Sequence, residues 1–157
     1  MPDGWQSIES RRNGAVDSEQ WALAAQPVVE PTLDGAERLG REYWRAVRRS
    51  TLGLVRSRES GDGVELRVLG LRPALLVFEP AHVAVTDDRV TCTFRIVRGA
   101  LARRAGGTLS LTQVGLATPE LRVAVKGFYP RLSFLYAPLE QRLHASVSRR
   151  YLAGGRR

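Results

Sequence analysis

The amino-acid sequence predicts an α+β fold in which an antiparallel sheet of about six to seven strands is followed by a long C-terminal helix. Apolar side chains recur at helical spacing over residues 34–50 and again over residues 138–152. Between these stretches, residues 52–127 form short segments in which apolar and polar side chains alternate. Short alternating segments joined by tight turns are typical of an antiparallel sheet with one buried face.

Residues 1–32 are expected to form a partly ordered N-terminal arm. This stretch is rich in turn-forming residues and contains one short helical candidate, residues 18–26, with Asp17 as its N-cap. Trp5 and Trp21 indicate that the arm docks on the domain itself or on a second copy of the chain. A homo-oligomer formed through the arm is therefore one expectation.

Residues 33–157 are expected to form a single α+β domain that begins with a helix capped by Asp34 and ending near Ser50. Four apolar residues form one stripe along this helix: Ala36, Leu39, Tyr43 and Val47. The opposite side carries charged residues, namely Arg38, Glu42, Arg45 and Arg49. Glu37 and Arg41 are spaced for a favourable ion pair. The stripe predicts one buried helix face.

The strand candidates follow one another along the middle of the chain. They comprise residues 52–58, 64–68, 74–78, 82–86, 89–98, 108–114 and 121–127. One hairpin can be placed in register, because Asp87-Asp88 predicts a two-residue turn. Val85 then faces Val90 and Val83 faces Cys92, so that the apolar side chains share one face.

Glu79 lies where this register continues past Pro80. Unbroken pairing would place Glu79 opposite Ile96 on the apolar face, where loss of hydration would raise the pKa of its carboxyl. Pro80 has no amide hydrogen to donate, so a bulge there can shift the register by one residue. We expect this bulge, with Glu79 turned outward.

A terminal helix is expected after Gly127 and Pro130 break the alternation. It begins at Pro138, a tolerated first-turn position, and ends at Leu152. Its inner stripe comprises Leu139, Leu143, Val147 and Tyr151.

Composition excludes several classes of protein. Of the 157 residues, 43% are apolar and 25% are charged, which is ordinary for a globular domain and unlike a disordered or fibrous chain. Cys92 is the only cysteine, so a disulfide scaffold and a cysteine-rich zinc site are excluded. The sequence has no apolar run long enough to span a bilayer and no signal-peptide pattern. These features predict a cytoplasmic protein without a transmembrane segment.

Positive charge is concentrated in the second half of the chain. Residues 1–88 contain 11 Arg against 14 Asp and Glu, whereas residues 89–157 contain 13 Lys and Arg against two Glu, for a net charge of +8 overall. A basic half of this kind can bind a polyanion. This predicts, as an alternative function, an interaction module that docks weakly on an anionic membrane surface or on nucleic acid. The candidate anion-binding residues are Arg103, Arg104, Arg149 and Arg150.

Motifs for catalysis are missing from the sequence. It contains no phosphate-binding loop, no dinucleotide fingerprint and no Gly-x-Ser-x-Gly elbow. His82 and His144 are too far apart in sequence to predict a metal site. Cys92 alternates into the apolar face, where a cysteine is usually a small core residue. We therefore expect no metal and no cofactor, and we assign no catalytic residue.

The order of helix, antiparallel strands and long terminal helix resembles the START-like helix-grip superfamily of polyketide cyclases and lipid-transfer domains. The resemblance covers residues 27–153, with residues 27–30 as the first strand. It implies a curved sheet wrapped around the terminal helix, with an apolar cavity between them. A closed lipocalin-like barrel with flanking helices fits the same alternation and is the alternative fold.

The resemblance implies that the chain holds a hydrophobic or lipid-like small molecule between the sheet and the C-terminal helix. The aromatic candidates for the cavity are Phe78, Phe94, Phe128 and Tyr136. Arg95 is a candidate for orienting an acidic headgroup. A second alternative, a cyclase- or dehydratase-like enzyme, requires Glu79 and His144 to lie close together inside the cavity.

Overall fold

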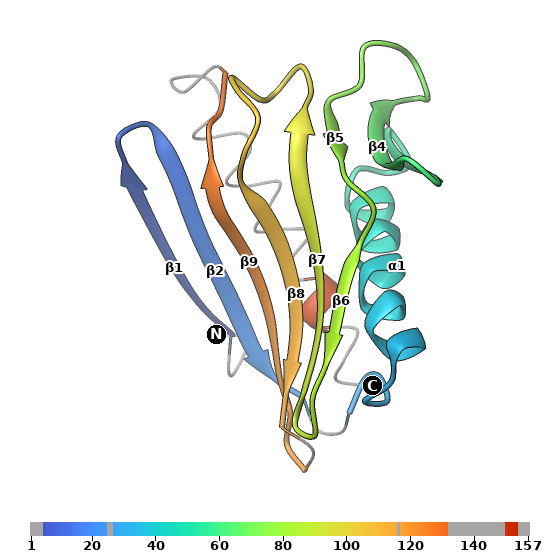
Figure 1. Ribbon diagram of the computed structural model, residues 1–157, viewed down its shortest axis with the longest axis vertical. Coiled ribbons are helices and arrows are strands. Elements are labelled where there is room, and N and C mark those ends of the chain that lie inside the picture. The colour runs from blue at the N-terminus through green and yellow to red at the C-terminus, as the bar shows by residue number, and fades with distance from the viewer. Residues whose placement is uncertain (1–4, 25–26, 116, 132–149, 154–157) are drawn as a thin grey trace.

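The computed structural model, which describes residues 5–24, 27–115, 117–131 and 150–153, contains a nine-stranded antiparallel sheet. Its strands are β1 (Trp5–Arg12), β2 (Ala15–Leu23), β3 (Val55–Ser60), β4 (Gly63–Val68), β5 (Leu76–Phe78), β6 (His82–Val85), β7 (Arg89–Arg98), β8 (Thr108–Val114) and β9 (Glu120–Phe128). They lie in the order β1-β2-β9-β8-β7-β5-β4-β3, with β6 paired to β7 off this path. The helix α1 (Leu33–Ser50) packs along β3, β6 and β7 (Figure 1).

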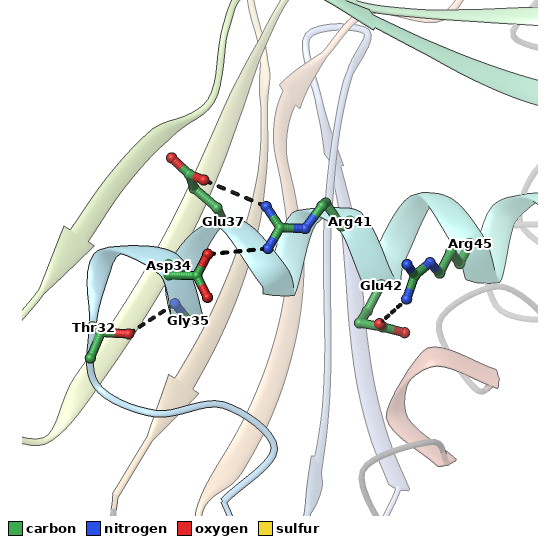
Figure 2. A network of polar contacts seen from close by, with 7 residues as sticks. All are labelled: Thr32, Asp34, Gly35, Glu37, Arg41, Glu42 and Arg45. Carbon is green, nitrogen blue, oxygen red and sulfur yellow. Dashed lines mark hydrogen bonds and ion pairs between the residues drawn. The ribbon is translucent and has the colours of Figure 1, made fainter.

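The helix α1 forms where the sequence predicts it, and all four residues of the predicted stripe are buried. Its N-cap is Thr32 rather than Asp34, because the Thr32 hydroxyl accepts a hydrogen bond of 3.0 Å from the amide of Gly35 (Figure 2). Asp34 lies instead in the first turn. There Arg41 contacts the carboxylates of Asp34 and Glu37 at 3.4 and 3.5 Å, so the predicted ion pair with Glu37 is present.

The N-terminal residues form strands rather than a helix. β1 and β2 make a hairpin around Asn13-Gly14, and β2 pairs with β9. The predicted helix over residues 18–26 is therefore wrong. Burial alternates along β2 with the two-residue period of a strand. The Asp17 side chain, expected to cap a helix, accepts a hydrogen bond of 2.6 Å from the amide of Gly127 on β9.

The hairpin of β6 and β7 has the predicted register. Val85 pairs with Val90 and Val83 pairs with Cys92. The slip by one residue expected at Pro80 is also present, because Ile96 pairs with Phe78 instead of Glu79, whereas His82 still pairs with Thr93. A second shift in register lies between Val77 and Phe78.

This slip turns Glu79 outward, as expected. The Glu79 amide donates a hydrogen bond of 2.9 Å to the carbonyl of Arg95, and its side chain is exposed.

The core between α1 and the sheet contains a cluster of aromatic rings. The ring centroid of Trp44 lies 5.0 Å from that of Phe94 and 5.2 Å from that of Phe78. Tyr43 makes an edge contact with Tyr151 at 5.6 Å, which places the helical residues 150–153 against α1. Such edge and tilted contacts stabilise a core beyond the area that they bury.

Gly40 sets the distance between α1 and β7. A Cβ atom at this position would lie 2.9 Å from the Phe94 ring and 3.1 Å from the Cys92 sulfur. Both distances are shorter than ordinary van der Waals contact, so the helix can pack this closely only because residue 40 has no side chain.

The order of elements contradicts the predicted helix-grip fold. β1 and β2 precede α1, and seven strands follow it. Within the described residues α1 is the one long helix, and it occupies the side of the sheet that the C-terminal helix was expected to fill. Of the predicted helix over residues 138–152, residues 150–152 are helical and the remainder lie outside the described residues.

The expected first strand and the alternative barrel are wrong as well. Residues 27–30 form no strand, because the side chain of Gln113 takes the place of a strand partner. Its Oε1 accepts hydrogen bonds from the amides of Val28 and Val29 at 2.8 and 3.1 Å, and its Nε2 donates to the Val29 carbonyl at 2.8 Å. The sheet path runs from β1 at one edge to β3 at the other, so the sheet is open rather than a closed barrel.

Candidate functional site

Two turns with the same Leu-Gly-Leu sequence lie side by side at one end of the molecule. Residues 51–54 follow α1 and residues 68–71 follow β4. In each turn the amide of the fourth residue donates a hydrogen bond to the carbonyl of the first, at 3.0 Å in the first turn and 2.9 Å in the second. The amide of Leu69 also donates a hydrogen bond of 2.7 Å to the carbonyl of Leu54, which joins the two turns.

Both turns hold a leucine in the left-handed backbone region. The φ angle is 53° at Leu52 and 51° at Leu69, and a glycine with positive φ follows each of them. Two consecutive positive φ angles in a hydrogen-bonded turn are typical of the type I′ turn, which favours asparagine, aspartate or glycine. In the β1–β2 hairpin the same position is held by Asn13, with φ of 52°. A leucine at this position costs roughly 1 kcal/mol, because its Cβ crowds the backbone.

The four leucines of these turns, here called the leucine tip, face solvent. The exposed fractions are 91% for Leu52, 52% for Leu54, 49% for Leu69 and 65% for Leu71. The connection between β4 and β5, which carries two of them, projects from the molecule beside the end of α1 (Figure 1). Burial therefore does not compensate the backbone cost at Leu52, and Leu69 is half-buried, so burial compensates its backbone cost more than at Leu52.

Four exposed arginines, here called the arginine rim, flank the leucine tip. They are Arg48 and Arg49 in the last turn of α1, Arg56 on β3 and Arg72 directly after the tip. The Nε of Arg56 donates a hydrogen bond of 3.1 Å to the carbonyl of Gly53, which holds this guanidinium against the first turn. Residues 48–56 and 66–76 contain no Asp or Glu, so no carboxylate from either turn offsets this charge.

A small apolar cavity of about 90 Å³ lies between α1 and the sheet. Of the four predicted aromatic ligand residues, Phe78 and Phe128 line it. Phe94 does not line it but packs against Trp44, which does. Tyr136 lies outside the described residues. The Nε1 of Trp44 is buried and has no hydrogen-bond acceptor among the described residues.

The other predicted ligand residues do not meet in this cavity. Glu79 and Arg95 are exposed on the outer surface, where their charged groups lie 4.0 Å apart. His144 lies outside the described residues, and His82 is exposed on β6. No carboxylate therefore lines the cavity among the residues that the structure describes.

Cys92 has the environment of a core residue. It is fully buried on β7, and this burial raises the pKa of its thiol to about 11. The thiol consequently stays protonated at neutral pH, whereas the thiolate is the reactive form.

The predicted anion-binding arginines lie in separate segments. Arg103 and Arg104 are exposed in the connection between β7 and β8, where the Arg104 guanidinium stacks 3.6 Å from the centre of the Tyr129 ring. Arg150 is exposed in the helical residues 150–153, and Arg149 lies outside the described residues.

The leucine tip was not predicted from the sequence. Residues 52–58 were expected to form a strand, whereas the strand begins at Val55 and the leucines before it belong to a turn. The available signal was the tripeptide Leu-Gly-Leu, which occurs at residues 52–54 and 69–71 with an arginine within two residues of each.

Comparisons with known proteins give no family for this chain. No family model matches it, and no curated protein matches it. Among solved structures, the chain is similar to the solution structure of cyanobacterial PsbP (CyanoP) from Synechocystis sp. PCC 6803. The TM-score is 0.37 and the identity 13%, over 93% of this chain and 82% of that one. The START-like resemblance is wrong, because no family model supports it and the order of elements differs.

The described part of the chain offers neither a membrane span nor a cluster of metal ligands. None of its helices combines the length and the apolar character needed to cross a bilayer. Nor do three or more His, Cys, Asp or Glu side chains gather there in a group that could hold a metal ion.

Proposed function

We propose that this protein docks on an anionic membrane surface by inserting the leucine tip between lipid headgroups. The observation that carries the proposal is the pair of left-handed leucines, Leu52 and Leu69, which are exposed at a backbone cost of roughly 1 kcal/mol each. In water, the 91% exposed Leu52 contributes little burial to offset this cost. Insertion of the exposed leucines into an apolar environment outside the protein would be favourable.

The energies of insertion are large enough for reversible binding. Moving a leucine side chain from water to an apolar environment gains roughly 1.5–3 kcal/mol when burial is complete. Each arginine close to an anionic surface adds about 1 kcal/mol. Peripheral attachment generally needs an apolar and an electrostatic contribution together, and the leucine tip and the arginine rim supply one of each.

The arrangement favours a lipid surface over nucleic acid as the anionic partner. Arginines bind phosphates in both, but nucleic-acid surfaces give exposed leucines no apolar phase to enter. Binding of single strands relies on aromatic side chains that stack with bases. The leucine tip contains none.

A cytoplasmic location is part of the proposal. The cytoplasmic leaflet carries the anionic lipids that attract basic segments. A homo-oligomer formed through the N-terminal residues stays a prediction, for which β1 at the edge of the sheet would be the contact strand.

The proposal is tested by sedimentation of the protein with vesicles of phosphatidylcholine, with and without phosphatidylglycerol. The wild-type protein should bind the anionic vesicles, and added salt should weaken this binding. The L54S/L71S variant should bind about tenfold or more weakly, because it removes two apolar side chains from the tip. The L33S variant is the matched control, since Leu33 is 63% exposed at the other end of α1. Equal binding by L54S/L71S and wild type would contradict the proposal.

A second candidate function is binding of an apolar small molecule in the cavity between α1 and the sheet. The unpartnered Nε1 of Trp44 favours it, because a ligand acceptor could satisfy this buried donor. The volume of about 90 Å³ limits the ligand. An engineered cavity of about 150 Å³ holds benzene, so this cavity suits a few heavy atoms or the end of an acyl chain rather than a whole fatty acid.

This second candidate is tested by native mass spectrometry of the purified protein and by thermal shift with fatty acids of graded length. A co-purified apolar molecule would support it, and ligand-free spectra without a thermal shift would contradict it. The enzyme alternative is not proposed, because Glu79 lies on the outer surface instead of inside the cavity.

A further inference from the structure

Three arginines converge on one cleft of the outer sheet surface, directly beside the leucine tip. The cleft has a volume of about 520 Å³ and is lined by Glu65, Arg67, Arg72, Pro73, Ala74 and Arg98. Glu65 and Arg67 lie on β4 on either side of the buried Leu66, so both side chains point away from the core. Arg72 belongs to the arginine rim as well, which makes the cleft continuous with the tip.

Positive charge in the cleft is only partly compensated. Glu65 is its single carboxylate; it accepts a hydrogen bond from the Arg67 guanidinium and lies 3.9 Å from that of Arg98. Arg72 makes no ion pair with any residue that the structure describes. Three guanidinium groups against one carboxylate leave two unit charges uncompensated.

Two further observations indicate that the arginines of the cleft destabilise the folded protein. Arg67 is mostly buried, with 15% of its side chain exposed, and its Nε has no hydrogen-bond partner among the described residues. Arg67 also pairs directly with Arg56 across β3 and β4. Like charges in opposed positions of a sheet are destabilising. A bound anion would offset both costs.

We propose that this cleft binds a phosphate monoester. A phosphate monoester carries roughly 1.5 to 2 negative charges at neutral pH, which matches the two uncompensated positive charges of the cleft. A diester carries one charge and leaves the other uncompensated. Guanidinium groups bind phosphate oxygens with paired, charge-assisted hydrogen bonds, and this geometry favours phosphate over a simple halide ion.

The identification of a lipid as the source of the phosphate rests on the proposed membrane docking. With the leucine tip inserted, Arg72 lies at the level of the headgroups, so the phosphate would belong to a lipid such as phosphatidic acid. The same chemistry would accept a soluble phosphate monoester. The two sources are separated by experiment.

The first experiment tests soluble ligands. It follows the arginine Nε–H signals by NMR during titration with inorganic phosphate and with glycerol 3-phosphate, at constant ionic strength. Signals of Arg67 and Arg98 should shift in the wild-type protein. The R98Q variant should bind about tenfold more weakly, because it removes one charge-assisted contact. R89Q is the matched control, since it removes the same charge at the other end of β7 and should bind as wild type does.

The second experiment tests a lipid source. It compares binding of the protein to vesicles containing phosphatidic acid and to vesicles containing phosphatidylglycerol, matched for surface potential. Preference for phosphatidic acid that R98Q abolishes and R89Q retains would support the lipid source. Phosphate binding in solution without such a preference would support the cleft with a soluble ligand. No shift at Arg67 and Arg98 together with no lipid preference would overturn the inference. Failure of tip insertion is recognised separately, because L54S/L71S would then bind vesicles as wild type does.

Discussion

The amide of Leu69 donates a hydrogen bond of 2.7 Å to the carbonyl of Leu54, and this contact joins two turns that are 17 residues apart in sequence into one surface. Each turn alone would present two leucines at the end of a helix or a strand. Joined, they present four leucines together with the arginines of both segments. The candidate membrane-docking surface is therefore a product of the fold rather than of either turn.

Replacement of the left-handed leucines should improve folding and abolish docking at the same time. In the L52N/L69N variant, asparagine adopts the positive φ angle more readily, as Asn13 does in the β1–β2 hairpin. Because asparagine relieves only part of the cost at each position, the free energy of unfolding should rise by roughly 1 kcal/mol in total, as measured by urea denaturation. Binding to anionic vesicles should fall in the same variant. A loss of stability in L52N/L69N would show that the leucines are retained for folding.

Gly40 should not tolerate a side chain. Alanine in place of a helix-interior glycine usually stabilises by up to about 1 kcal/mol. In G40A, however, the new methyl group would lie 2.9 Å from the buried Phe94 ring, and overpacking of this kind costs roughly 1–3 kcal/mol. We expect G40A to lower the free energy of unfolding by about 1 kcal/mol. G61A is the control, because no atom lies within 4 Å of its added methyl group; equal effects of the two substitutions would refute the packing argument.

The side chain of Gln113 should be essential for the segment before α1. Its three hydrogen bonds to Val28 and Val29 connect this segment to β8. The Q113L variant keeps the volume but leaves buried backbone groups without partners, which costs roughly 1–3 kcal/mol for each group. Chemical denaturation should show a loss of about 3 kcal/mol, whereas Q6L on the exposed surface of β1 should change stability little. A neutral Q113L would mean that the contacts are dispensable.

Stability should fall at high pH because of Cys92. The thiol has a pKa of about 11 in the folded protein, against an ordinary value of 9.0. Below pH 9 the thiol is protonated in both states, and between these values only the unfolded state loses the proton. The free energy of unfolding should therefore decrease by roughly 1 kcal/mol per pH unit over this range. Comparison with C92A isolates the effect, since the variant should lack this part of the slope; identical slopes would contradict a buried, protonated thiol.

The local sequence pattern was sufficient to predict those features that depend on a single helix or a single turn. The buried face of α1 could be predicted because its apolar residues recur at helical spacing within one segment. The β6–β7 register followed from a short turn, and the outward position of Glu79 followed from the missing amide hydrogen of Pro80. These features depend on neighbours in sequence.

Features that depend on distant segments were not predictable in the same way. Residues 18–26 were expected to be helical, yet β2 pairs with β9 about 100 residues later, and this pairing decides its conformation. Likewise, the leucine tip needs Leu54 and Leu69 to meet, which no local propensity encodes. The helix-grip resemblance failed for the same reason, since an order of elements does not specify which strands pair.

Insertion of the leucine tip can be measured at residue 52 itself, whose surroundings should change from water to lipid at a membrane. Cys92 is buried and protonated, so an environment-sensitive fluorophore can be attached selectively to the introduced thiol of L52C, with L33C as the control. On addition of phosphatidylglycerol vesicles, we expect a blue-shifted, brighter emission from position 52 and an unchanged spectrum from position 33. An unchanged spectrum from position 52 in protein that sediments with the vesicles would contradict insertion of the leucine tip.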